Sequence, residues 1–233
     1  MEDPSPREIA YTFHLAGGRC ERIGLKFDPA TFLLLSEPAA AEPWIALDVN
    51  KCPNCPLSAA TQPECPFAKA LAGFIHGFDE FYSYEKAVVE VVTGQRTIIS
   101  NHPLQDGMAS IIGLIGATSG CPHLAFFRPM ARFHLPFASE EETLFRMFSI
   151  FLLGEYLQAG GRGDAMIGVA GLQARYEAVA IVNRSMAERI RSAFAKDAVV
   201  NAIIILDTFA QAAPYVIRDK LAELRHIFPI PAP

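Results

Sequence analysis

Four of the five cysteines of this 233-residue sequence stand immediately before a proline, at Cys52, Cys55, Cys65 and Cys121. Cys52 and Cys55 form a Cys-x-x-Cys unit, which places two thiolate ligands about one turn apart, and the following prolines restrict the chain at each ligand. Thiolates are soft ligands that favour zinc or iron–sulfur clusters over calcium or magnesium. The pattern predicts a metal site formed by these four cysteines.

The spacing does not choose between metals. A zinc ribbon would carry a second Cys-x-x-Cys, which this sequence lacks, although Cys65 and Cys121 could complete a four-cysteine zinc shell. An iron–sulfur cluster is the alternative cofactor, since cluster ligands also include Cys-Pro, and haem is a further alternative because Cys-Pro can supply an axial thiolate. The interpretation without a cofactor is that the cysteines are compact apolar residues beside prolines that shape turns.

Cysteine usage agrees with a reducing compartment. The acidic, proline-rich start of the chain does not have the form of an export signal. The most apolar stretch, Met147 to Leu157, contains Glu155 and is shorter than the roughly 20 residues of a spanning helix. We therefore expect a cytoplasmic protein without a membrane partner, in which closely spaced cysteines are metal ligands or reactive thiols in preference to disulfides.

Composition describes an ordered globular protein. Hydrophobic residues make up 51% and charged residues 19% of the chain, and the formal net charge is -5. The sequence has no basic block and no stripe of Lys and Arg interleaved with aromatic residues. Nucleic acid is therefore not an expected partner.

The elements that position the cysteines fall into two parts. Apolar residues alternate on both sides of Gly17-Gly18, which predicts an antiparallel hairpin over 9–27 that includes Cys20. The following region predicts strands at 45–49, 87–93 and 96–100 and a helix at 67–78. The Cys-x-x-Cys unit would then follow the end of a strand.

The sequence beyond residue 103 predicts helices. Ser139 and Glu142 form a capping box before an amphipathic run, and Gly120 ends the preceding helix just before Cys121. The predicted helices are 104–118, 139–157, 165–194, 197–212 and 214–227. The fold class is thus α+β: a small antiparallel β-sheet with one helix over 1–103, followed by an all-α part over 104–233, with one integrated domain as the alternative.

Other residues could bind a ligand beside the cysteines. His123 follows Cys121 closely and could replace a cysteine as a ligand, whereas Arg128, Arg132 and His134 are candidates for binding a small anionic molecule. Both histidines could instead be hydrogen-bonded structural residues. Serine-hydrolase, phosphate-loop and zinc-protease motifs are missing from the sequence.

Three short motifs carry a resemblance to a known family. They are Cys52-Pro-Asn-Cys55-Pro-Leu, Ser119-Gly-Cys121-Pro and His134-Leu-Pro-Phe137. In these motifs the chain resembles an uncharacterised family of bacterial proteins, a domain of unknown function, over roughly its middle third. The resemblance implies a bacterial origin and a joint site of the cysteines and the His134 segment, and it implies no mechanism.

Three functions of different class follow from the sequence. The first is a metal-binding protein in which zinc, structural or sensory, ties the β part to the helical part through Cys121. The second is an enzyme that uses an iron–sulfur cluster or a thiolate and binds an anionic substrate nearby. The third is an interaction module without metal, whose helices from Ser139 onward form a homo-oligomer or dock a protein partner.

Overall fold

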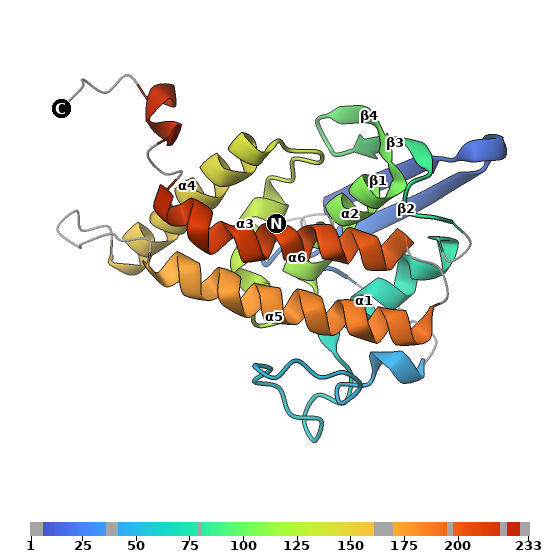
Figure 1. Ribbon diagram of the computed structural model, residues 1–233, viewed down its shortest axis with the longest axis horizontal. Coiled ribbons are helices and arrows are strands. Elements are labelled where there is room, and N and C mark those ends of the chain that lie inside the picture. Colours follow the sequence, from blue (N-terminus) through green and yellow to red (C-terminus); the bar gives the residue numbers. More distant parts are fainter. Residues whose placement is uncertain are drawn as a thin grey trace, which may run out of the picture.

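A central helix lies between a β-sheet and a pair of long helices (Figure 1). The structure is a computed structural model that describes residues 7–35, 42–78, 81–160, 170–194, 198–219 and 223–228. Within these ranges, apolar side chains from before and after residue 103 share one hydrophobic core. The predicted α+β class, with an antiparallel sheet first and helices after it, is confirmed.

The sheet has four antiparallel strands in the order β2-β1-β3-β4. The hairpin expected over 9–27 is confirmed, and Gly17 and Gly18 at its turn have φ values of 73° and 77°, a conformation that glycine adopts without steric cost. Cys20 begins the second strand of this hairpin, as expected. The strands are β1 (Arg7–His14), β2 (Cys20–Phe27), β3 (Lys86–Val92) and β4 (Thr97–Pro103).

The central helix is α2 (Leu104–Thr118), which is buried on nearly every side. It contacts β3 and β4 on one side and α6 on the other, so an apolar residue is favoured at almost every position. Gly107 permits the close approach to the sheet. A Cβ atom at this position would lie 2.8 Å from the Phe13 ring and 2.9 Å from Cγ2 of Val89.

The remaining helices surround α2. Ser139 caps α4 as predicted: its Oγ accepts from the amide of Glu142 at 3.2 Å, and its own amide donates to the Glu142 carboxylate at 2.8 Å. The α-helices are α1 (Pro66–Ile75), α3 (Arg128–Arg132), α4 (Glu140–Gln158), α5 (Ala170–Ala193) and α6 (Ala198–Asp219). Short 3-10 turns are η1 (Ala16–Gly18), η2 (Pro43–Ile45), η3 (His76–Phe78), η4 (Ala125–Phe127) and η5 (Glu223–Ile227).

The strand expected at 45–49 is wrong. This segment is η2 followed by turns, and it makes only the isolated bridge between Ala46 and Glu64. Its carbonyl groups are satisfied from elsewhere, because Arg189 of α5 donates to those of Trp44 and Leu47. A side chain therefore supplies the donors that a neighbouring strand would have provided.

The break expected between helices 197–212 and 214–227 is also wrong. Helix α6 runs through Pro214 to Asp219, and η5 follows separately. A proline removes one backbone donor at a cost of about 3 kcal/mol, which the packing of α6 against α5 and α2 can offset. The expected start of α5 at 165–169 lies outside the described residues.

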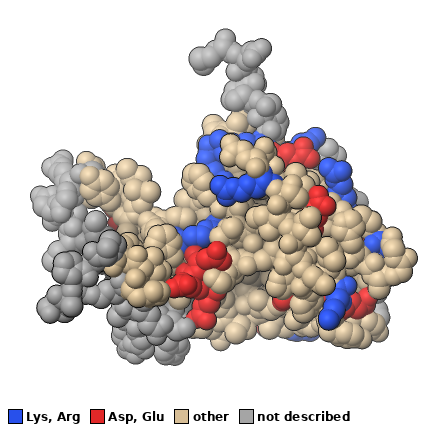
Figure 2. All heavy atoms as spheres, turned by 90° about the horizontal axis from the view of Figure 1, so that it is seen from above, with Lys and Arg blue, Asp and Glu red and all other residues tan. Residues whose placement is uncertain are grey.

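The surface is of mixed charge on the face drawn in Figure 2. Lys and Arg stand in small groups beside similar groups of Asp and Glu, among many uncharged residues. None of the helices in the described ranges combines the length and the apolar character that crossing a membrane requires.

Candidate functional site

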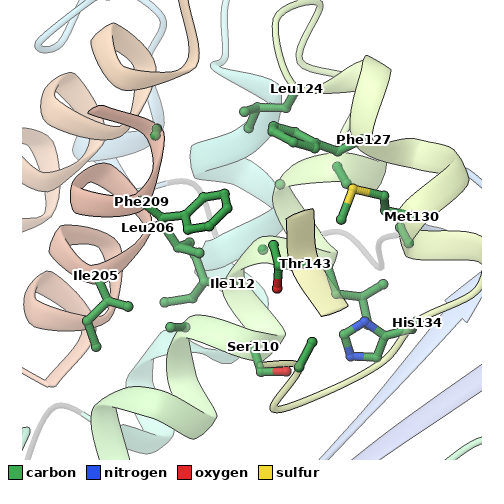
Figure 3. A pocket seen from close by; sticks show the side chains of 18 of the residues that line it. Ser110, Ile112, Leu124, Phe127, Met130, His134, Thr143, Ile205, Leu206 and Phe209 are labelled. Carbon is green, nitrogen blue, oxygen red and sulfur yellow. The ribbon is translucent and has the colours of Figure 1, made fainter. Parts of the chain in front are cut away.

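A cavity of about 440 Å³ lies between α2 and the helices α3 to α6 (Figure 3). Its wall is mainly apolar and includes Phe127 and Met130 on one side and Leu206 and Phe209 of α6 on another. Ligand sites in proteins are typically hollows of about 300 to 1,000 Å³ with apolar walls and a few fixed polar groups. The size and the lining therefore match those of a small-molecule site.

The hollow exists because one face of α2 carries small side chains. Ser110, Gly113 and Ala117 line the cavity and are spaced by three and four residues, which places them on the same face of the helix. A Cβ atom on Gly113 would contact only Leu206, at 3.8 Å. The space that larger residues would fill is left open between α2 and α6.

A hydrogen-bonded group of three side chains closes one end of the cavity. The hydroxyl of Tyr11, which reaches from β1 and is fully buried, lies 2.9 Å from Oγ of Ser110 and also hydrogen-bonds Nε2 of His134. Ser110 and His134 line the cavity, where Figure 3 shows them side by side. Tyr11 thus joins two polar side chains of the cavity wall to the sheet.

All three members of this group are uncharged at neutral pH. Burial raises the pKa of Tyr11 well above its usual value of 10.0, against a smaller lowering by the hydrogen bond to Ser110. Burial, and then the positive charge of Arg146, lowers the pKa of His134 to about 3. A buried histidine that stays neutral can donate at one ring nitrogen and accept at the other.

Two further polar side chains reach the cavity from α5. Tyr176 and Asn183 are only 1% and 4% exposed, and both line the cavity. Within the described part of the chain neither side chain has a hydrogen-bond partner, and burial raises the pKa of Tyr176 far above its usual value. The Tyr176 ring packs edge-on against Phe127 and Phe209, with ring centres 5.4 and 6.1 Å apart. Their polar atoms are not among the fully enclosed atoms that lack a partner in the described residues, so they stay accessible to a molecule in the cavity.

The wall of the cavity contains one basic and one acidic residue. Arg146 of α4 donates through Nη2 to the carbonyls of Met130 and Phe133, at 2.9 and 3.0 Å. Asp106 of α2 lies with Oδ2 3.5 Å from Nδ1 of His102. In the described ranges no other Asp, Glu, Lys or Arg lines this cavity.

The predicted metal ligands lie in a separate region, where two connections meet α1 and α5. His123 lies with Nε2 2.7 Å from the carbonyl oxygen of Asn54, so the segment after Cys121 contacts the Cys-x-x-Cys loop. The residue before Cys121 also lies close to the residue after Cys65, because a Cβ atom on Gly120 would lie 3.9 Å from Cβ of Pro66. The structure therefore brings segments together that carry all four predicted ligands.

The four thiols influence one another, and each is free. Burial raises the pKa of Cys121 to about 11, and Cys65 and Cys52 add to this increase. Burial also raises the pKa of Cys52, against a hydrogen bond with Ser185 of α5. However, among the residues that the structure describes, no three His, Cys, Asp or Glu side chains are grouped so that they could hold a metal ion.

Comparison with known proteins identifies a family but no activity. The model of a domain of unknown function, DUF6901, matches residues 9–229. The chain belongs to the DUF6901 family. The expectation of an uncharacterised family is confirmed, and the match extends from β1 to the C-terminal 3-10 turn. Neither the curated proteins nor the solved structures contain a match to this DUF6901 chain.

The residues expected to bind a ligand beside the cysteines do not share one hollow in this DUF6901 protein. His134 lines the cavity, and His123 lines a smaller hollow of about 230 Å³ beside α5. Arg132 points elsewhere: its Nη atoms lie 3.4 Å from the carbonyl oxygen of Pro29. Arg128 lines neither hollow, and its buried Nε has no hydrogen-bond partner within the described ranges.

Sequence reasoning missed most of the cavity. Tyr11 was covered only by the predicted 9–27 hairpin, and the sequence predicted no role for Ser110, Tyr176 or Asn183. The available signal was the series of small residues on α2, in a helix that is otherwise strongly apolar. Such a series indicates either close helix packing or a hollow, and only the structure decides between them.

Helix α4 carries exposed apolar residues of the kind that an interface between protein chains would cover. Leu153 and Leu157 are 56% and 64% exposed, and Tyr156 is 39% exposed. Apolar patches of this kind are typical of contact surfaces when they are continuous. The homo-oligomer or protein partner stays a prediction for this DUF6901 protein.

Proposed function

We propose that the protein binds a small, mainly apolar molecule in the cavity between α2 and helices α3 to α6. The observation that supports this function best is the combination of an apolar hollow of about 440 Å³ with the buried Tyr11–Ser110–His134 group at one end. Apolar walls would stabilise the body of a ligand by removing it from water, at about 25 cal/mol per Å². The polar group would fix its orientation.

The fluorescent probe N-phenyl-1-naphthylamine, which is apolar and uncharged, tests this function. Its emission should rise on addition of the protein and saturate at one probe per chain. Gly113→Leu should abolish saturable binding, because the new side chain would extend into the cavity. Gly73→Leu is the matched control, since Gly73 is an exposed helical glycine of α1 with open space around it. Equal binding by both variants would show that the cavity is not the binding site.

The second candidate function is binding of a soft metal ion by Cys52, Cys55, Cys65 and Cys121. It is favoured by the contact between the two cysteine-bearing connections and by the free state of all four thiols. A cytoplasmic location in a bacterium, which we include in this proposal, would keep the thiols reduced. Zinc is the first choice and an iron–sulfur cluster the alternative, and either would require the four thiols to draw closer together.

Metal content after purification without oxygen tests this second candidate. About one zinc per chain, or an iron–sulfur absorbance, should be present in the wild type and lost in Cys121→Ser. Cys20→Ser is the matched control, because Cys20 is exposed on β2 and lies outside the group. The candidate fails if wild-type protein holds no metal, or if Cys121→Ser retains it.

A further inference from the structure

We infer that the ligand of the cavity is uncharged: an apolar body that carries hydroxyl, carbonyl or amide groups, and neither a carboxylate nor an ammonium group. The inference rests on the proposed binding function and specifies its chemical class. It depends on which polar side chains line the cavity, on their charge, and on the hydrogen bonds that they already make within the protein.

The polar side chains of the cavity wall that lack hydrogen bonds within the described residues are neutral. Tyr176 and Asn183 are buried and lack hydrogen bonds within the described residues, so a ligand would supply the missing partners. An amide and a hydroxyl can each donate and accept, which suits a neutral hydroxyl, carbonyl or amide group. A site with buried polar groups discriminates strongly against molecules that leave them unpaired.

The opposite wall is neutral as well. Ser110 and His134 face the cavity and are tied to Tyr11, whose hydroxyl is fully buried. In Figure 3 they lie at the far end from Phe127, which packs against Tyr176. Ser110 and His134 are thus set apart from Phe127 in the cavity, and apolar residues such as Leu206 also line the wall.

The two charged residues of the wall do not form an ion-binding site. Arg146 is the cation that a carboxylate would seek, but its Nη2 already donates to two backbone carbonyls, at 2.9 and 3.0 Å, and the nearby carboxylate of Glu142 already stabilises its charge. Asp106 adds a negative charge to the same wall and would repel an anion. Among its Asp, Glu, Lys and Arg residues the described wall has one charge of each sign, so it offers no excess charge to compensate an ion that leaves water, and burial of an uncompensated ion is costly.

Displacement of N-phenyl-1-naphthylamine by three molecules with the same alkyl chain tests the inference. At neutral pH, 1-decanol should displace the probe at about tenfold lower concentration than decanoate or decylammonium, a difference of about 1.4 kcal/mol. Because an alcohol also partitions more readily into any apolar phase, the wild type alone does not suffice. The preference must depend on the polar residues of the wall.

Asn183→Leu and Tyr176→Phe provide that control, since each removes a polar group and keeps the branching or the ring of the side chain. Each should raise severalfold the concentration of 1-decanol that displaces the probe, expressed relative to that variant's own affinity for the probe. The inference is overturned if decanoate or decylammonium displaces the probe at lower concentration than 1-decanol, or if both variants bind 1-decanol as the wild type does. Absence of saturable probe binding in the wild type would instead overturn the proposed binding function.

Discussion

Arg189 of α5 donates from Nη1 to the carbonyl oxygen of Trp44, at 2.7 Å and across 145 positions of sequence. The same guanidinium also donates to the carbonyls of Ala46 and Leu47, and Arg189 is only 2% exposed. One buried cation thus holds the segment that leads to the Cys-x-x-Cys loop against α5. Removal of this side chain would leave the carbonyls of Trp44 and Leu47 without a donor among the described residues, whereas that of Ala46 also accepts from the Val49 amide.

We therefore expect Arg189→Met to lower the free energy of unfolding by about 3 kcal/mol, because each unsatisfied buried acceptor costs about 1 to 3 kcal/mol. Urea unfolding followed by circular dichroism measures this change. Arg191→Met is the matched control on the exposed side of the same helix and should change stability by less than about 0.5 kcal/mol. Equal effects of both substitutions would contradict the anchoring role.

Two glycines of α2 should respond in opposite ways to alanine. Gly107→Ala should destabilise the protein by about 1 to 3 kcal/mol, because its Cβ atom would overlap the Phe13 ring and Val89. Gly113→Ala should stabilise it by up to about 1 kcal/mol, since the helix gains propensity and the methyl group finds room. Thermal unfolding of the two variants checks the sign of each change, and a gain for Gly107→Ala would refute the close approach of α2 to the sheet.

Stability should depend on pH through His134. Its pKa is about 3 in the folded protein and near 6.5 when unfolded, so the neutral form stabilises the fold above about pH 6.5. As the pH falls below this value the unfolded state binds the extra proton, and stability is lost at about 1.4 kcal/mol per pH unit.

Urea unfolding at about pH 7 and pH 5 measures this dependence. The loss of stability between the two should be about 2 kcal/mol smaller in His134→Gln than in the wild type. His14→Gln, an exposed position at the end of β1, should keep the wild-type dependence. If His134→Gln also kept it, the buried neutral histidine would be excluded as its source.

The thiol of Cys121 should react slowly in the folded protein. Its pKa of about 11 against the ordinary 9.0 reduces the thiolate fraction near neutral pH about a hundredfold. Alkylation by iodoacetamide, followed by peptide mass spectrometry, should therefore label Cys121 much faster in urea than in buffer. Exposed Cys20 provides the internal reference, and equal rates for Cys121 in both conditions would contradict its burial.

The sequence was most informative where local pattern decides structure. The 9–27 hairpin follows from alternation around two glycines, and the start of α4 follows from the capping box of Ser139. The segment 45–49 has the same alternation and is not a strand, and the carbonyls of Ala46 and Leu47 bond Arg189 of a distant helix instead of a neighbouring strand. A contact between residues so far apart leaves no trace in local periodicity.

The candidate site, too, was predictable from the sequence only in part. The helix end at Gly120 predicted that Cys121 lies in a connection, and the Cys-x-x-Cys unit was expected in a turn. The structure places both in connections, with Cys52 close to Cys121. The cavity was not predictable, because its wall combines residues from all six α-helices, from β4, from η4 and from loops. His134 was expected beside an anionic ligand, yet its neutral state follows from the burial that Tyr11 and neighbouring elements create.

The hydrogen bonds of Tyr11 to Ser110 and His134 can run in either direction, because all three groups are neutral. If Nε2 of His134 accepts from Tyr11, then Tyr11 accepts from Ser110, and Ser110 offers lone pairs to the cavity. If Nε2 carries the proton, each bond reverses, and the Ser110 hydroxyl can donate. A bound molecule that donates or accepts at Ser110 would thereby select the tautomer of a histidine that it need not touch, and the ring nitrogen-15 chemical shifts of His134 would report which kind of molecule is present.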